Sequence, residues 1–167
     1  MRISKIAIKN KLVNLFIILL IFFIDRLSKI YLLNLYESGA ETNIYIYSFL
    51  NINLVWNTGI GFGLFSSDAN FVYHSITTLI GLINLIIIYM VYIIIDVRKY
   101  FLFMVLGGSL GNLFDRIYYY AVPDFIDFHL GDFHWSVFNI ADIFITVGII
   151  GLIFKELLKK EKISKDD

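Results

Sequence analysis

The sequence predicts a mainly α membrane protein in which four transmembrane helices carry a small extracytoplasmic β-element. The chain of 167 residues is 59% hydrophobic, and its mean hydropathy is +0.77, whereas soluble domains are about 45–50% apolar. Long apolar segments recur along the chain, and one polar segment rich in β-forming residues interrupts them. We expect residues 1–167 to form a single membrane domain.

Composition excludes several classes of function. The chain has no cysteine, which excludes a thiol nucleophile and a thiolate metal site. The formal net charge is zero, so no nucleic-acid partner is expected. His74, His129 and His134 lack a metal-ligand spacing, and Ser109 and Ser136 lack a histidine partner for a serine mechanism. We therefore expect no metal and no cofactor.

Residues 12–35 are predicted to form the first transmembrane helix. A basic N-terminus followed by an apolar run is also typical of a cleaved signal peptide. No small-residue cleavage site follows, however, and Asp25, Arg26 and Lys29 interrupt the run instead, which favours a retained helix. Asp25 and Lys29 stand at i and i+4 in the favourable order, so they either anchor this helix or take part in binding.

Residues 36–70 predict a small extramembrane β-element, because positions 44–54 partly alternate and turn residues are frequent. Glycine occupies every second position of a short run: Gly59, Gly61 and Gly63. Bulges and close packing explain such glycines as well as ligand binding does. Asn57 indicates a turn first, and binding of a peptide backbone by strand-like pairing second.

The second half of the chain predicts three more helices. Residues 71–95 carry no formal charge and are long enough to cross a hydrocarbon core of about 30 Å. A third helix is expected over 100–120 and a fourth over 138–158, with 121–137 as a short polar connection. Lys and Arg concentrate in 1–11, in the 96–99 loop and in the C-terminal tail, which places both termini in the cytoplasm and the β-element outside.

Aspartates gather around the turn between the third and fourth helices: Asp115, Asp124, Asp127, Asp132 and Asp142. Carboxylates beside lipid are costly. Because the chain turns back on itself here, we predict that Asp124 and Asp142 meet at the outer membrane boundary. Asp127 and Asp132 are interpreted as ordinary connection residues.

A close pair of carboxylates is suited to hydrolysis. Low dielectric and mutual repulsion keep one member protonated. The ionised member takes a proton from water while the other donates to the substrate carbonyl. Two simpler interpretations stay open at this point: Asp142 as an acceptor at a helix start, where the dipole favours an anion, and Asp124 as a loop carboxylate.

Other polar residues share helix faces with these aspartates. Asn112, Asp115 and Arg116 stand at i, i+3 and i+4, and we predict an ion pair between Asp115 and Arg116 that lowers the cost of both near lipid. Asn139 shares a face with Asp142 and is placed to orient its carboxylate.

Five short blocks follow one another in order: DRLSK at 25–29, NTGIGFG at 57–63, GNLFDR at 111–116, VPDFIDF at 122–128 and FNIAD at 138–142. With these blocks the chain resembles the lipoprotein signal peptidases, the type II signal peptidases of bacteria, over nearly its whole length. Each block alone is weak evidence, but all five in this order within four predicted helices are specific.

The resemblance implies a four-helix membrane aspartic endopeptidase with an extracytoplasmic β-cradle. It implies a multi-pass protein of the bacterial cytoplasmic (inner) membrane with its active site at the outer face. The implied substrate is a prolipoprotein, cut just before a diacylglyceryl-modified cysteine. Membrane lipid is the second implied partner, and we expect a monomer.

The matching positions carry implied roles. The catalytic positions are matched by Asp124 and Asp142. Positions that line or support the substrate site are matched by Asn57, Gly59, Asn112, Arg116 and Asn139, and supporting positions by Asp25, Lys29 and Asp115. Pro123 stands where a second valine is usual, and Gly61 where alanine or serine is usual. Neither departure changes a carboxylate or an amide.

Two other classes of function remain as alternatives. A small channel or proton-coupled transporter would use aspartates near the membrane midplane and a polar path to both sides. A non-catalytic lipoprotein-binding or assembly factor would tolerate loss of one aspartate. The expected position of both carboxylates toward one face, and the charge-free segment 71–95, favour the hydrolase.

Overall fold

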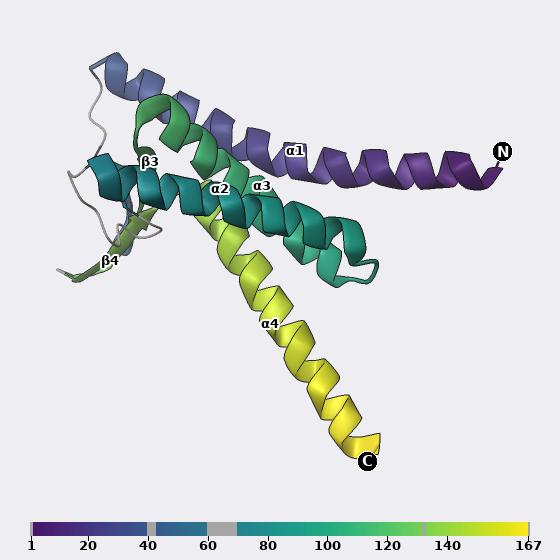
Figure 1. Ribbon diagram of the computed structural model, residues 1–167. Helices are drawn as coiled ribbons and strands as arrows, with labels where there is room; N and C mark the ends of the chain where they lie inside the picture. The colour runs from purple at the N-terminus through teal and green to yellow at the C-terminus, as the bar shows by residue number, and fades with distance from the viewer. Residues whose placement is uncertain (1, 40–42, 60–69, 132, 167) are drawn as a thin grey trace.

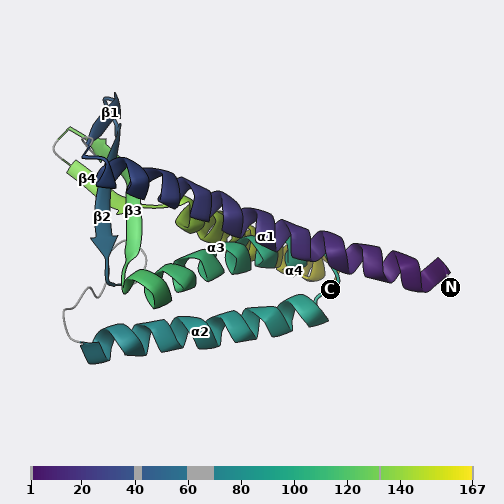
Figure 2. The same cartoon turned by 90° about the horizontal axis from the view of Figure 1, so that it is seen from above.

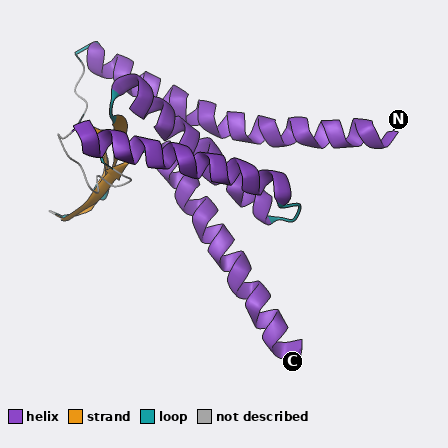
Figure 3. Ribbon diagram, in the orientation of Figure 1, coloured by secondary structure: helices purple, strands orange, loops and turns teal. Residues whose placement is uncertain are grey.

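Helices make up most of the protein, and a small antiparallel sheet lies at one end of them (Figures 1 and 3). The structure, a computed structural model, describes residues 2–39, 43–59, 70–131 and 133–166. The helices are α1 Arg2–Glu37, α2 Asn70–Ile93, α3 Arg98–Tyr119 and α4 Ile140–Asp166. The strands are β1 Ile44–Tyr47, β2 Leu50–Asn57, β3 Val122–Leu130 and β4 Phe133–Phe138. A mostly helical protein with a small β-element is thus confirmed.

The expected polar connection over 121–137 was wrong, because β3 and β4 occupy most of it. Phe138 ends β4, so α4 begins only at Ile140. The strand β3 gives no alternating pattern in the sequence because Val122–Phe125 is buried on both faces. Within the segment 36–70, the described part forms β1 and β2, whereas Gly61 and Gly63 lie outside the described residues.

The strands follow one another across the sheet in the order β1-β2-β3-β4, and each neighbouring pair is antiparallel. β2 and β3 lie side by side in Figure 2 and pair from Leu50–Phe128 to Asn57–Val122, with an irregularity between Ile52 and Val55. This long-range pairing brings the end of β2 beside the start of β3, and so places Asn57 close to Asp124.

Helix α3 packs against α1, α2 and α4. Its glycines permit the closest approaches: a Cβ atom on Gly107 would lie 2.9 Å from the Ile18 carbonyl oxygen of α1, and one on Gly108 would lie 2.5 Å from the Ala141 carbonyl oxygen of α4. The apolar core between the helices consists of Ile18, Ile87, Leu102, Phe103, Val105 and Leu106. Close backbone contact at Gly107 therefore fixes α1 against α3, and close contact at Gly108 fixes the start of α4 against α3.

Helix α3 ends at Tyr119, and its C-cap residue Tyr120 has a left-handed φ of 60°. The chain passes from there directly into β3 at Val122. The hydroxyl of Tyr73 on α2 donates to the Arg116 carbonyl oxygen across 2.6 Å, in the last turn of α3. These contacts hold the start of β3, and therefore Asp124, at the end of the helical bundle.

Among the described residues, one helical segment, Phe71–Ile93, is long and apolar enough to cross a membrane on length and composition alone. Many other side chains exposed on the helices are also apolar, including Leu12, Phe16, Phe23, Leu27, Ile117, Ile150 and Phe154.

Candidate active site

Asp124 of β3 and Asp142 of α4 line the same cavity, which has a volume of about 260 Å³. Both side chains are buried. Asp142 lies in the first turn of α4, and Asp124 lies on the strand that follows α3. The predicted meeting of residues from the two sides of this turn is therefore seen in the structure. The other polar residues around the cavity are Asn57, Ser109, Asn112, Arg116, Asn139 and Thr146.

Asn139 contacts both aspartates. Its backbone N–H donates to Asp142 Oδ2 across 3.1 Å, and its Oδ1 accepts from the backbone N–H of Asp142 across 3.1 Å. This reciprocal pair is a capping box, which satisfies donors at the start of α4. The Nδ2 group of Asn139 donates to Asp124 Oδ1 across 2.5 Å. Asn139 thus caps the helix that carries Asp142 and also binds the carboxylate of Asp124.

Asn57 binds the second oxygen of Asp124. Its Nδ2 group donates to Asp124 Oδ2 across 2.9 Å, and its Oδ1 accepts from the backbone N–H of Gly59 across 2.8 Å. Because a backbone N–H only donates, it fixes which end of the amide faces the carboxylate. The Gly59 carbonyl oxygen in turn accepts from Nη2 of Arg116.

Asn112 binds Asp142 and is itself held by a buried lysine. Its Nδ2 group donates to Asp142 Oδ1 across 2.9 Å. Lys29 Nζ donates to Asn112 Oδ1 across 2.8 Å, to Asp25 Oδ2 across 2.8 Å and to Asp115 Oδ2 across 2.7 Å. Lys29 is fully buried, and these contacts use all three donors of an ammonium group.

Asp25 ties the first helix to the fourth. Its Oδ1 accepts from the backbone N–H of Ala141 across 3.0 Å, next to Asp142. Gly111 of α3 makes room for it, because a Cβ atom there would lie 2.6 Å from Asp25 Oδ2. The network of Asp25, Lys29 and Asp115 therefore links α1, α3 and α4 behind the carboxylate pair.

The predicted ion pair between Asp115 and Arg116 was wrong. Consecutive residues of a helix point in different directions, so they do not face each other. Asp115 pairs with Lys29 and with Arg26 of α1, whereas Arg116 lies on the cavity and donates to the carbonyl oxygens of Gly59 and Asn112.

Sequence reasoning assigned no role to Arg26, although it stands in the DRLSK block. Arg26 is 5% exposed, and its guanidinium carbon lies 4.8 Å from the Phe114 ring centroid and 5.7 Å from that of Tyr119. An arginine within an apolar helix requires a partner inside the protein, and this requirement was the sequence feature that could have pointed to a role for Arg26.

The remaining aspartates of the turn do not join the pair. Asp127 is 3% exposed on β3, so it is a buried strand residue and not the ordinary connection residue that we expected. It does not line the cavity. Asp132 lies outside the described residues. In the part of the chain that the structure describes, no three His, Cys, Asp or Glu side chains are grouped to hold a metal ion.

Burial raises the pKa of Asp124 to about 7, and the charge of Asp142 adds to this effect. The amides of Asn57 and Asn139 oppose it by stabilising the anion. Near neutral pH Asp124 therefore still carries a proton in part of the molecules, whereas an ordinary aspartate is ionised. Such a proton belongs to the pair as a titrating unit. The cavity can accordingly supply a proton acceptor and a proton donor together.

Known proteins are similar to this chain in sequence and in fold. Residues 17–158 match the family described as signal peptidase (SPase) II. The lipoprotein signal peptidase of Pelagibacter ubique (strain HTCC1062) is 52% identical over 159 residues, which cover 95% of this chain and 96% of that protein. The lipoprotein signal peptidase of Anaplasma phagocytophilum (strain HZ) is 36% identical over 160 residues, 93% of this chain and 99% of its own.

Two solved structures of bacterial membrane enzymes are also similar. One, at 2.3 Å resolution, has a TM-score of 0.67 and 27% identity, with 89% of each chain covered. The other, at 1.9 Å resolution, has a TM-score of 0.61 and 28% identity, covering 88% of this chain and 93% of its own. The family match, the identities and the shared fold agree, and the chain belongs to the signal peptidase II family.

Proposed function

We propose that this protein removes the signal peptide from diacylglyceryl-modified prolipoproteins as an aspartic endopeptidase, with Asp124 and Asp142 as its catalytic residues. Protease activity and prolipoprotein substrates follow from membership of the family. The observation that carries the aspartic mechanism is the pair itself: two buried carboxylates on one cavity, each held by directed N–H donors.

The proposed reaction needs one proton shared by the pair. The ionised carboxylate takes a proton from water, whose oxygen attacks the scissile carbonyl carbon. The protonated carboxyl group donates to the carbonyl oxygen, which gives a tetrahedral gem-diol. The proton then passes to the leaving nitrogen, the C–N bond breaks, and a new carboxyl group and the free amine of the cysteine result. The pair ends as it began, with one proton.

The surroundings of the same cavity support the proposed substrate-binding residues. Asn57 and Gly59 stand at the end of β2, whose exposed neighbours Val55 and Trp56 offer a surface for an extended peptide. Arg116 binds the Gly59 carbonyl oxygen and keeps this segment against the cavity. We assign to Asn57, Gly59, Arg116, Asn112 and Asn139 the positioning of substrate and carboxylates.

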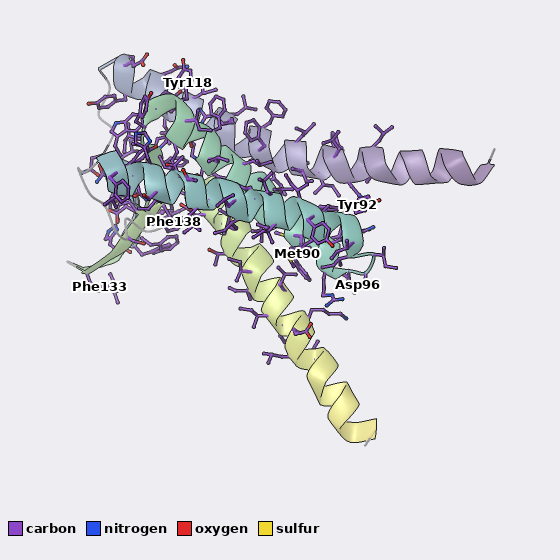
Figure 4. The ribbon with its side chains drawn as sticks, in the orientation of Figure 1. Met90, Tyr92, Asp96, Tyr118, Phe133 and Phe138 are labelled. Carbon is purple, nitrogen blue, oxygen red and sulfur yellow. The ribbon has the colours of Figure 1, made fainter. Side chains whose placement is uncertain are left out.

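All four helices are proposed to cross the inner membrane. Mean hydropathy understates α1 and α3 because their charged residues, Arg26 and Lys29 on one and Asp115 and Arg116 on the other, are buried inside the protein rather than facing lipid. Phe71–Ile93 spans about 35 Å at 1.5 Å per residue. Figure 4 shows Tyr118 and Tyr92 toward opposite ends of the helices, as expected of interfacial aromatic residues.

The distribution of charge supports the orientation that we propose. The N-terminal segment, the loop at 96–99 and the C-terminal tail carry most of the Lys and Arg residues, so we place them in the cytoplasm. Both chain ends lie away from the sheet (Figure 1). The sheet and the carboxylate pair then lie at the outer face, where a secreted prolipoprotein is reached. We propose a monomer, because one chain supplies both carboxylates and their donors, with membrane lipid as its surroundings.

The test of this function is cleavage by the purified protein in lipid nanodiscs. A diacylglyceryl-modified prolipoprotein should lose its signal peptide, seen as a shift in size, and a chelator should not prevent it. An unmodified prolipoprotein serves as the control. Binding without a shift in size would favour an assembly factor, and ion flux in vesicles without cleavage would favour a channel; either result contradicts the proposal.

A further inference from the structure

The two carboxylates differ in what surrounds them. Asp124 is on a strand, and its donors in the described part of the chain are the side-chain amides of Asn57 and Asn139. Asp142 is the third residue after the helix cap Asn139, and it accepts a backbone N–H there. The start of a helix carries partial positive charge, which stabilises an anion. The fold therefore favours negative charge on Asp142 over Asp124.

Lys29 strengthens this difference through Asn112. An ammonium group has donors and no acceptor, so the amide oxygen of Asn112 must face Lys29. The NH₂ end of the same amide must then face Asp142 Oδ1, where it lies at 2.9 Å. A reversed amide would place N–H against N–H at one end and oxygen against oxygen at the other. Lys29 thus fixes a donor on Asp142 without touching it.

Charged groups of both signs surround Asp142, so the positive charge of Lys29 affects whether Asp142 is ionised. Asp124 faces it from β3, Arg116 from α3, and Asp25 and Lys29 from α1. Asp115 of α3 lies behind Lys29 and is shared with Arg26. Without Lys29, the negative charge of Asp25 would act on Asp142 with less compensation.

We propose that Lys29 is a positioning residue that determines which aspartate acts as the base and which as the acid. Through the amide of Asn112 it keeps Asp142 ionised as the base, which leaves the proton on Asp124 as the acid. This inference rests on the proposed aspartic mechanism and assigns its two roles.

The assignment fixes the path of each proton. Asp142 takes a proton from the attacking water, and Asp124 gives its proton to the carbonyl oxygen. In the gem-diol, Asp142 then passes its proton to the leaving nitrogen while Asp124 recovers one from a hydroxyl group. The C–N bond breaks as the carbonyl group forms again. Asp142 is left ionised and Asp124 protonated, ready for the next substrate.

The pH profile of kcat/KM tests the inference, because its acid limb reports the ionised base. Lys29→Met removes the cation, and Asn112→Asp keeps an oxygen for Lys29 while placing another oxygen against Asp142. Both should move the acid limb to higher pH by about one unit or more. Lys99→Met, in the first turn of α3 and far along that helix from Asn112, should leave the profile unchanged. A lower rate with an unmoved acid limb would show a merely structural lysine.

A second measurement does not depend on activity. In an Asp124→Asn background, the protonation of Asp142 can be followed by the infrared C=O stretch of its carboxyl group. Adding Asn112→Leu, which keeps every charged group, should raise the midpoint of that titration, and an unchanged midpoint would overturn the inference. Wild-type protein that fails to cleave at any pH would instead refute the proposed function, so the two failures are distinguishable.

Discussion

The side-chain amide of Asn139, the residue between β4 and α4, donates to Oδ1 of Asp124 on β3 across 2.5 Å. The same amide accepts the backbone N–H of Asp142 and so caps α4. The Asn139 side chain therefore has two roles, as the cap of α4 and as a donor to Asp124, and two substitutions can separate these roles.

Asn139→Ser should keep the helix cap, because serine is a good N-cap residue, while removing the donor to Asp124. We expect kcat/KM to fall on the order of 10²-fold, as when one preorganised donor is lost, with Tm close to that of the wild type. Asn139→Ala should lose both, with about 1 kcal/mol less stability. Full activity in Asn139→Ser, measured by prolipoprotein cleavage, would show that the contact with Asp124 is unimportant.

Gly108→Ala should separate α3 from α4 next to the pair. Its Cβ would lie 2.5 Å from the Ala141 carbonyl oxygen, and a backbone atom cannot move aside cheaply. Overpacking of this kind costs about 1–3 kcal/mol, and cleavage should fall with it.

Gly81→Ala on α2 is the matched control, because nothing lies within 4 Å of its added Cβ. It should raise the stability by up to about 1 kcal/mol through helix propensity and leave cleavage unchanged. Equal Tm values for the two alanine variants would contradict the close packing at Gly108.

Asp124 should make the stability of the wild type depend on pH. Its pKa rises to about 7 in the folded protein, from an ordinary value near 3.8, through burial and the charge of Asp142. The folded state then holds more protons than the unfolded state between these values, so stability should fall as the pH rises from about 4 to 7. Asp124→Asn should remove the part of this slope that Asp124 contributes. Parallel Tm curves for wild type and variant over that range would contradict it.

The sequence predicted the carboxylate pair for a physical reason that the structure retains. Asp124 and Asp142 flank a chain reversal that can bring them together. Carboxylates beside apolar segments cost free energy unless they have a partner or a functional role. The contact between Asn139 and Asp142 could also be predicted, because it depends only on the spacing of two residues along one helix start.

The elements that sequence reasoning missed depend on contacts between distant residues. The strand β3 has Pro123 and two aspartates, which disfavour a strand, and it forms because β2 pairs with it from about seventy residues away. The partners of Asp115 lie on α1, so no spacing within α3 indicated Arg26 or Lys29. The cap that Asp25 places on Ala141 spans the chain in the same way.

The most direct test of the central claim is cleavage by single aspartate variants in nanodiscs. Asp124→Asn and Asp142→Asn should each lower the release of signal peptide from a diacylglyceryl-modified prolipoprotein by at least about 10²-fold, while each protein stays folded by its Tm. Asp96→Asn, in the exposed loop between α2 and α3, should cleave like the wild type. Cleavage at the wild-type rate by either pair variant would contradict the assignment of Asp124 and Asp142 as the catalytic residues.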